Sequence, residues 1–171
     1  MDNIIGNYDI FLWDVFHNIK NVGFELSEFS ELDHMCYRVE TSERYIAKKI
    51  ELGKIGELLS EEIIADRPIA IYKLKIPILV HGFKIYYMEL PAPKINNRFK
   101  EGLEHVEFVI NVSLHDFLVK HHNINFCLDS YDREINPELE IEFEHCAVKF
   151  HKKNILEVIA IQKLTKKQSN S

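Results

Sequence analysis

Two acidic–histidine pairs are the residues of this sequence best suited to metal chemistry. They are Asp33-His34 and Glu104-His105, and 71 positions separate the first histidine from the second. Each pair lies among apolar and β-favouring residues, which predicts a strand around it. Imidazole and carboxylate groups together suit Zn²⁺, Fe²⁺, Mn²⁺, Co²⁺ or Ni²⁺. The pairs therefore indicate a candidate metal site, provided that the fold brings them together.

Side-chain alternation along strands identifies the groups that would join the two histidines. Successive side chains point to opposite faces of a strand, so only alternate residues of each strand can reach a common site. Glu89 and His151 lie near the ends of two further predicted strands. If the two halves of the chain pack about a pseudo-twofold axis, the faces carrying His34 and His105 meet, with these two residues alongside. Four ligand-type side chains would then converge on one divalent ion.

Two alternatives stay open at this stage. A buried histidine can satisfy both ring nitrogens with backbone or carboxylate partners and bind no metal. Glu157 is a rival for the fourth ligand position, but its spacing from Asn154 is that of a capping box, which directs the carboxylate to its own helix N-terminus. The order of preference for ligands is therefore His34, His105 and Glu89, then His151, and Glu157 last.

Hydrophobic periodicity and turn residues predict similar elements in the two halves of the chain. An amphipathic helix over 8–22 comes first, and a C-terminal helix begins after Asn154 and gives way to a frayed polar end over 165–171. Ile46 and Ile50 are expected to face inward from a helix over 43–52. The remaining predictions are a helix over 114–121 and strands over 32–40, within 61–74, and over 81–90, 102–111, 125–128, 139–143 and 146–151.

These elements follow the order β-α-β-β-β twice. The acidic–histidine pairs occupy matching positions in the first strand of each unit, so a diverged duplication is the economical explanation. We therefore expect an α+β fold made of two paired βαβββ modules within one compact domain. The expected boundaries are an N-terminal helical extension over 1–30, a first module over 31–93, a connector over 94–101, and a second module with a short C-terminal helix over 102–171.

Five ordered sequence segments add a family resemblance. They are LDHMCYRVE, GELLSEEIIADRPIAIYKL, MELPAP, EGLEHVEFVI and VKFHKKNILEVIA. Together they resemble the bacterial YecM-like family, a branch of the vicinal oxygen chelate superfamily that includes glyoxalases, epimerases and extradiol dioxygenases. The resemblance covers nearly all of 32–161. It implies that the paired modules curl into a cup-shaped mixed sheet, with a divalent metal ion held by strands of both modules.

Carried over position by position, the resemblance implies metal ligands at His34, Glu89 and His105. The superfamily usually has a glutamate as the fourth ligand, where this sequence offers His151. With His151 bound, three histidines and one carboxylate favour isomerase, epimerase or lyase chemistry. Without it, two histidines and one carboxylate form the triad that activates O₂ at Fe²⁺. Glu89 either stays a ligand or acts as the catalytic base, and the family resemblance supplies no substrate.

Three further residues are candidates for contacts with a substrate. Arg38 and Arg67 could hold a substrate carboxylate in bidentate fashion, although surface charges paired with nearby acids are an equal alternative. Glu107 could serve as a hydrogen-bond acceptor beside the metal or as a general base, but an exposed or cross-strand-paired carboxylate is the preferred interpretation. The expected ligand is a small metabolite with two adjacent oxygens. A non-enzymatic binding module or a structural interaction domain are the competing functional classes.

Composition narrows the classes of partner. The chain of 171 residues carries 21 basic and 27 acidic residues, a net charge of −6, and lacks the basic stripe of a nucleic-acid binder. Its apolar runs are too short to span a bilayer, and its first residues lack the pattern of a secretory signal. Three cysteines without a CxxC spacing are expected to be reduced, so a cytoplasmic location is predicted. A homodimer is an expectation by analogy with the superfamily.

Overall fold

The computed structural model of the chain describes residues 1–94 and 100–169. Most of the expected connector, 95–99, and the last two residues lie outside the described part. The helices are α1 (Asp2–Ile5), α2 (Tyr8–Asn21), the 3₁₀ helix η1 (Leu26–Glu28), α3 (Ser42–Ile55), α4 (Leu114–Lys120) and α5 (Ile155–Ser169). The strands are β1 (Phe29–Arg38), β2 (Gly56–Ile64), β3 (Arg67–Val80), β4 (Phe83–Pro91), β5 (Gly102–Ile110), β6 (Glu138–Glu142) and β7 (Ala147–His151).

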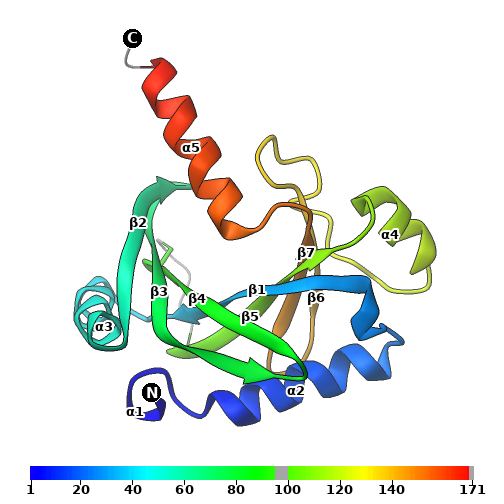
Figure 1. The fold of residues 1–171 in the computed structure, drawn as a ribbon, viewed down its shortest axis with the longest axis horizontal. Coiled ribbons are helices and arrows are strands. Elements are labelled where there is room, and N and C mark those ends of the chain that lie inside the picture. Colours follow the sequence, from blue (N-terminus) through cyan, green and yellow to red (C-terminus); the bar gives the residue numbers. More distant parts are fainter. Residues whose placement is uncertain (95–99, 170–171) are drawn as a thin grey trace.

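A single mixed sheet joins the two halves of the chain. Its strand order is β2-β3-β4-β1-β5-β7-β6, so β1 and β5 form the antiparallel pair at the centre. In the first half β1 pairs in parallel with β4, and in the second half β5 pairs in parallel with β7. Figure 1 shows this sheet curling without closing, with α5 rising from its open side. The predicted α+β fold with a curled mixed sheet is confirmed.

The second half departs from the first in one strand. The predicted strand over 125–128 is reduced to a single bridge, in which Cys127 and Glu140 exchange backbone hydrogen bonds. The segment that follows Cys127 is rich in turns up to the start of β6, so the pairing extends no further. The second half therefore contributes three strands to the sheet and the first half contributes four.

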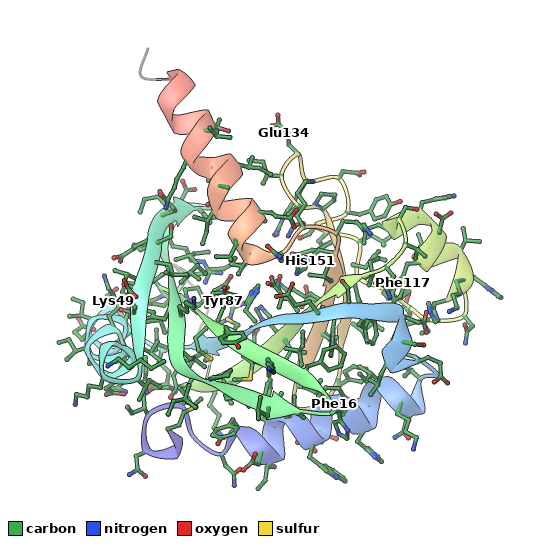
Figure 2. All side chains as sticks on the ribbon, in the orientation of Figure 1. Phe16, Lys49, Tyr87, Phe117, Glu134 and His151 are labelled. Carbon is green, nitrogen blue, oxygen red and sulfur yellow. The ribbon has the colours of Figure 1, made fainter. Side chains whose placement is uncertain are left out.

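Alternation along the central strands separates an aromatic core from polar side chains. Phe108 on β5 and Phe150 on β7 are fully buried, and both pack near Phe29 at the start of β1, with ring centroids 4.5 and 5.7 Å from it. Helix α2 lies along this side of the sheet, with Phe16 directed toward it (Figures 1 and 2). The Phe16 ring packs edge-on against Phe108. The residues next to these phenylalanines in sequence, among them Glu107, face the opposite side.

Helix α3 buries a different face from the predicted one. Ile46 and Ile50 are 62% and 65% exposed, so the prediction that they face inward is wrong. The buried residues are instead Tyr45, Lys48 and Leu52, which lie three and four positions apart on one helical face. Lys48 is tolerated there because its ammonium group donates to the Ile4 carbonyl at 2.7 Å and pairs with Glu51. A prediction of the buried face of α3 from its apolar residues alone therefore gave the wrong face.

Element boundaries also differ from the sequence prediction, among them the start of β4 and the end of α5. His81 and Gly82 form the turn between β3 and β4, with φ angles of 45° and 88°, so the predicted strand over 81–90 begins two residues later. Hairpin turns of two residues favour such positive φ angles because their twist matches that of the strands.

Helix α5 continues to Ser169, so the residues from Thr165 to Ser169 are helical and not frayed. Among the described residues, no helix is both long and apolar enough to cross a membrane.

Candidate metal centre

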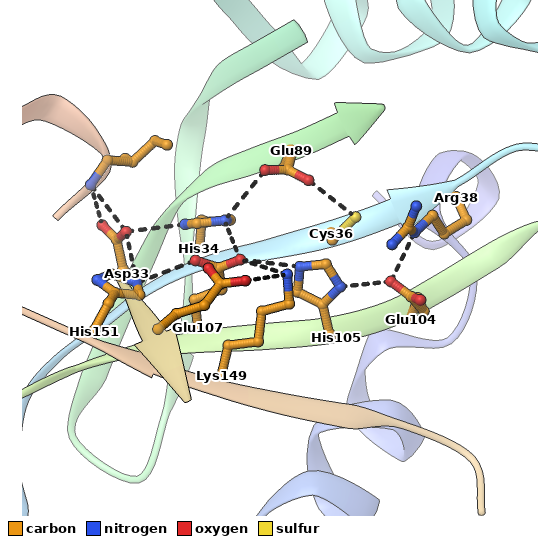
Figure 3. A network of polar contacts seen from close by, with 12 residues as sticks. Asp33, His34, Cys36, Arg38, Glu89, Glu104, His105, Glu107, Lys149 and His151 are labelled. Carbon is orange, nitrogen blue, oxygen red and sulfur yellow. Dashed lines mark hydrogen bonds and ion pairs between the residues drawn. The ribbon is translucent and has the colours of Figure 1, made fainter. Parts of the chain in front are cut away.

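The antiparallel pairing of β1 with β5 brings the two acidic–histidine pairs together. In the register of these strands His34 lies opposite Glu107, and Cys36 lies opposite His105. Both histidines are buried. Ligand atoms of His34, His105 and Glu107 all lie within 4.8 Å of one another (Figure 3). Residues distant in the sequence thus meet on one side of the sheet, as the pseudo-twofold arrangement requires.

Each imidazole is oriented by the acidic residue that precedes it. His34 Nδ1 donates to Asp33 at 2.9 Å, and His105 Nδ1 donates to Glu104 at 2.5 Å. The Nε2 atoms of both rings are thereby left to face the centre of the site. His34 Nε2 is buried and has no hydrogen-bond partner among the described residues. Metal-binding histidines commonly show this arrangement, in which a carboxylate fixes the tautomer and the ring orientation.

A β-bulge explains how Asp33 reaches the same side as His34. Leu32 pairs with Phe108 and His34 pairs with Glu107, so Asp33 is the extra residue on β1. Its carboxylate also accepts the backbone N–H of Ile155, at 2.9 and 3.1 Å, and so caps the start of α5. Strict alternation would have turned Asp33 away from the site. The repeated acidic–histidine pair was the available signal for its role.

Glu107 lies at the centre of the polar network. One carboxylate oxygen is 3.5 Å from His34 Nε2, 3.2 Å from His105 Nε2 and 3.5 Å from Lys149 Nζ. The other oxygen is 3.2 Å from His151 Nε2. Glu107 is buried and is paired across the strands with Lys149, so the expectation of an exposed side chain is wrong while that of a cross-strand pair is met. Its position makes it a candidate ligand, a role that the sequence analysis did not assign to it.

Glu89 approaches the centre from β4. Its Oε2 atom is 3.8 Å from His34 Nε2, and its Oε1 atom is 3.5 Å from Cys36 Sγ. Cys36, Glu89 and His105 form a second group whose ligand atoms lie within 4.8 Å of one another. The Glu89 side chain is 17% exposed, so this carboxylate borders the open space beside the site. From the sequence, Cys36 was expected only to be a reduced thiol.

Neither of the two candidates for a fourth ligand is a member of these groups among the described residues. His151 is fully buried, and its Nε2 atom lies beside Glu107 and 3.7 Å from Asp33 (Figure 3). Among the described residues it belongs to neither group of three ligand atoms. Glu157 accepts the backbone N–H of Asn154 at 2.9 Å, while Asn154 accepts that of Glu157 at 3.1 Å. This is the predicted capping box, and it holds Glu157 at its own helix.

Burial and charge together shift the acid–base properties of the centre. Burial acts to lower the pKa of His34, but the negative charges of Glu107 and Asp33 outweigh it and raise this pKa well above its ordinary value. Burial acts to raise the pKa of Glu107, but His34 and Lys149 hold it well below the usual range. The pKa of Glu104 falls to about 2 against the effect of burial, because His105 and Arg38 bind its charged form. Glu107 and Glu104 therefore stay ionised, and their negative charges attract a cation.

A cavity of about 360 Å³ adjoins the candidate centre. His34, Glu89 and Glu107 contribute to its wall, and the first turns of α5 form part of its lining. Arg38 and Arg67, the predicted substrate contacts, also line it. The volume matches the lower end of the range that ligand pockets occupy in proteins.

The two arginines differ in their pairing. Arg38 Nε donates to Glu104 at 2.7 Å, so this residue supports the orientation of His105 as well as lining the cavity. Arg67 donates from Nη1 to the backbone carbonyl of Ala92 at 3.0 Å. It forms no ion pair with any described residue, unlike Arg38. Its buried Nε atom has no hydrogen-bond partner among the described residues. Burial and the nearby charge of Arg38 lower the pKa of Arg67.

Comparison with known proteins agrees with this fold. A solved structural-genomics protein superimposes with a TM-score of 0.74 at 24% identity, covering 89% of this chain and 87% of that one. A methylmalonyl-CoA epimerase of Streptomyces coelicolor, solved with 2-nitronate-propionyl-CoA, superimposes with a TM-score of 0.53 at 13% identity, covering 73% of this chain and 98% of the epimerase. The epimerase is a member of the vicinal oxygen chelate superfamily. At these identities the likeness shows a shared fold.

Sequence comparison identifies the family of the chain. The protein YecM of Escherichia coli is 30% identical to it over an alignment of 149 positions, and the match covers 75% of this chain and 76% of that protein. The profile of the family described as YecM protein matches residues 1–162. Because this match includes α2, the curled sheet and the start of α5, it spans the elements that build the candidate centre. The chain therefore belongs to the YecM protein family.

Proposed function

We propose that this protein is a divalent-metal-dependent enzyme of the vicinal oxygen chelate type, which isomerises or epimerises a small oxygenated anion. The observation that carries the proposal is the approach of His34, His105 and Glu107 within 4.8 Å, beside a cavity of about 360 Å³. The fold that the chain shares with an epimerase adds support.

The donor groups fit a divalent ion of the first transition series. His34 and His105 each present a buried Nε2 atom whose ring is fixed from the far side by a carboxylate. The orphaned Nε2 atom of His34 would gain a partner from the ion. We assign His34, His105 and Glu107 as the ligands, with Glu89 adjacent. A bound ion would act as a Lewis acid that stabilises negative charge on substrate oxygens.

Glu89 is the residue we assign to proton transfer. Its carboxylate borders the cavity and, among the described residues, contacts the thiol of Cys36 and the ring of His34 at the distances given above. A carboxylate with this freedom can accept a proton from a carbon next to a carbonyl group and return it to the adjacent carbon of the enediolate, which isomerises the substrate. Helix α5 covers part of the cavity lining and would exclude water from this transfer.

The environment of Arg67 indicates which charge the substrate carries. Arg67 is half-buried, and its buried Nε atom has no hydrogen-bond partner among the described residues, which is costly unless an anion binds to it. Arg67 lines the same cavity as Glu89 and lies close enough to Arg38 for their charges to repel. We therefore propose that the substrate carries a carboxylate or another anionic group that binds at Arg67, while its adjacent oxygens face the metal ligands.

Elemental analysis of the purified protein tests the metal centre. We expect one divalent ion per chain in the wild type, and loss of the ion in His34→Ala, His105→Ala and Glu107→Gln. Glu157→Ala is the matched control, because it removes a carboxylate close to the site that only caps a helix. Wild-type protein that takes up no divalent ion, or equal retention in all four variants, would refute the proposal.

A second activity is favoured by the position of His151. Because it lies outside both groups of ligand atoms, the centre offers two histidines and one carboxylate, the arrangement with which Fe²⁺ activates O₂. Substrate-dependent O₂ uptake by the iron-loaded protein would select an oxygenase. Exchange of a substrate hydrogen with deuterated water, without O₂ uptake, would select an isomerase. Binding of a metabolite without turnover would indicate a binding module.

A further inference from the structure

We propose that Cys36 is a metal ligand, so that the centre can hold a thiophilic ion through sulfur together with His105 and Glu89. This inference rests on the proposed function, since it concerns the same centre. It changes the expected chemistry of the ion, because thiolate sulfur favours softer ions such as Zn²⁺ over Mn²⁺.

The strand register places Cys36 directly between the other two groups. Cys36 lies opposite His105 on β5 and opposite Glu89 on β4. Side chains at directly paired positions of neighbouring strands project to the same side of the sheet. The sulfur, one imidazole nitrogen and one carboxylate oxygen accordingly lie within 4.8 Å of one another. Three different strands thus hold three ligand-type groups on one rigid scaffold.

The environment of Cys36 differs from that of an ordinary packed thiol. Its Sγ atom is 3.5 Å from Glu89 Oε1, and the pair faces the polar side of the sheet (Figure 3). Cys146, by contrast, is part of the hydrophobic core and accepts from the side-chain amide of Asn18 at 3.7 Å, and Cys127 lies at the isolated bridge. Among the described cysteines, Cys36 alone belongs to a group with metal-ligand geometry.

His105 belongs to both groups of three, so the two groups describe alternative ligand sets of one centre. An ion on the Cys36 side would replace the S–H bond by a sulfur–metal bond. Sulfur keeps the electron pair, and the proton passes to Glu89 Oε1 and from there to solvent through the cavity that Glu89 lines. Carboxylate, imidazole and thiolate together give Zn²⁺ three of the four ligands that it usually takes in proteins.

Absorption of the cobalt-loaded protein tests this proposal directly, because a thiolate bound to Co²⁺ gives a charge-transfer band in the near ultraviolet. The chain has three cysteines, so the double variant Cys127→Ser/Cys146→Ser retains Cys36 as its one thiol. We expect the band in the wild type and in this double variant, and its loss in Cys36→Ser. We also expect Cys36→Ser to weaken Zn²⁺ binding more than Mn²⁺ binding.

The outcomes separate this inference from the proposed function. Cobalt that binds with visible ligand-field bands but without the charge-transfer band in the double variant would overturn the role of Cys36 and leave the His34, His105 and Glu107 centre standing. Failure of the wild type to bind cobalt, zinc or manganese would overturn both. Because the double variant keeps Cys36, its spectrum decides the question even if Cys36→Ser does not fold.

Discussion

At the scale of single residues, the two carboxylates behind the histidines do as much to define the centre as the histidines themselves. Asp33 and Glu104 each hold the Nδ1 atom of the next residue, so the two halves of the chain repeat one device. Asp33 combines this with capping α5, and Glu104 combines it with binding Arg38. A change in either carboxylate is therefore expected to alter metal binding without removing a ligand.

Asp33→Asn isolates this effect. The amide oxygen can still accept the backbone N–H of Ile155, so the start of α5 is retained, but the negative charge that holds His34 is lost. We expect metal affinity to fall by roughly 10–100-fold, the range found for such supporting groups. Competition with a chromophoric chelator measures the affinity. Glu157→Gln is the control, and unchanged affinity in Asp33→Asn would show that the pair is only structural.

At the scale of elements, registers and caps decide which residues meet. The acidic–histidine pair repeats in the first strand of each half, and for this reason the approach of His34 to His105 was predictable from the sequence. The bulge at Asp33 was not, because one extra residue in a strand leaves no mark in an apolar–polar pattern. The buried face of α3 was missed for a different reason: Lys48 finds partners in Glu51 and the Ile4 carbonyl that only the folded chain provides.

Glu28 links η1 to α4 and gives a test at this scale. Its carboxylate accepts from Lys120 at 2.7 Å and from His121 at 2.8 Å. Burial acts to raise the pKa of Glu28, but these groups and the Glu25 amide lower it below its ordinary value of 4.5. A carboxylate whose pKa is lower in the folded than in the unfolded state stabilises the fold at pH values above its unfolded-state pKa. This stabilisation is lost as the pH falls through its folded-state pKa.

We therefore expect Glu28→Gln to reduce the free energy of unfolding by about 1 kcal/mol near neutral pH. The difference from the wild type should shrink as the pH is lowered below 4.5, since protonation removes the charge from the wild-type carboxylate as well. Urea unfolding over this pH range measures both quantities. Glu144→Gln, at a site 88% exposed, is the control. A difference that grows toward acid pH would contradict the assignment.

At the scale of the whole molecule, the centre ties the two halves of the chain to each other. His34 belongs to β1 of the first half, whereas His105 and Glu107 belong to β5 of the second. These strands already pair with each other, so a bound ion adds a second link across the same junction. An ion that binds the folded but not the unfolded protein raises the free energy of unfolding. This increase grows with the logarithm of the ratio of the free ion concentration to Kd.

Metal addition should consequently stabilise the entire fold and not one half. With free ion about 100-fold above Kd, we expect the free energy of unfolding to rise by about 2.7 kcal/mol and the melting temperature by roughly 5–10 °C. Thermal unfolding should remain a single transition, because loosening either half separates the ligands. The double variant His34→Ala/His105→Ala should show no metal-dependent shift. Two transitions in the metal-loaded wild type, with only one of them shifted, would mean that the ion binds within one half and that the β1–β5 junction does not hold it.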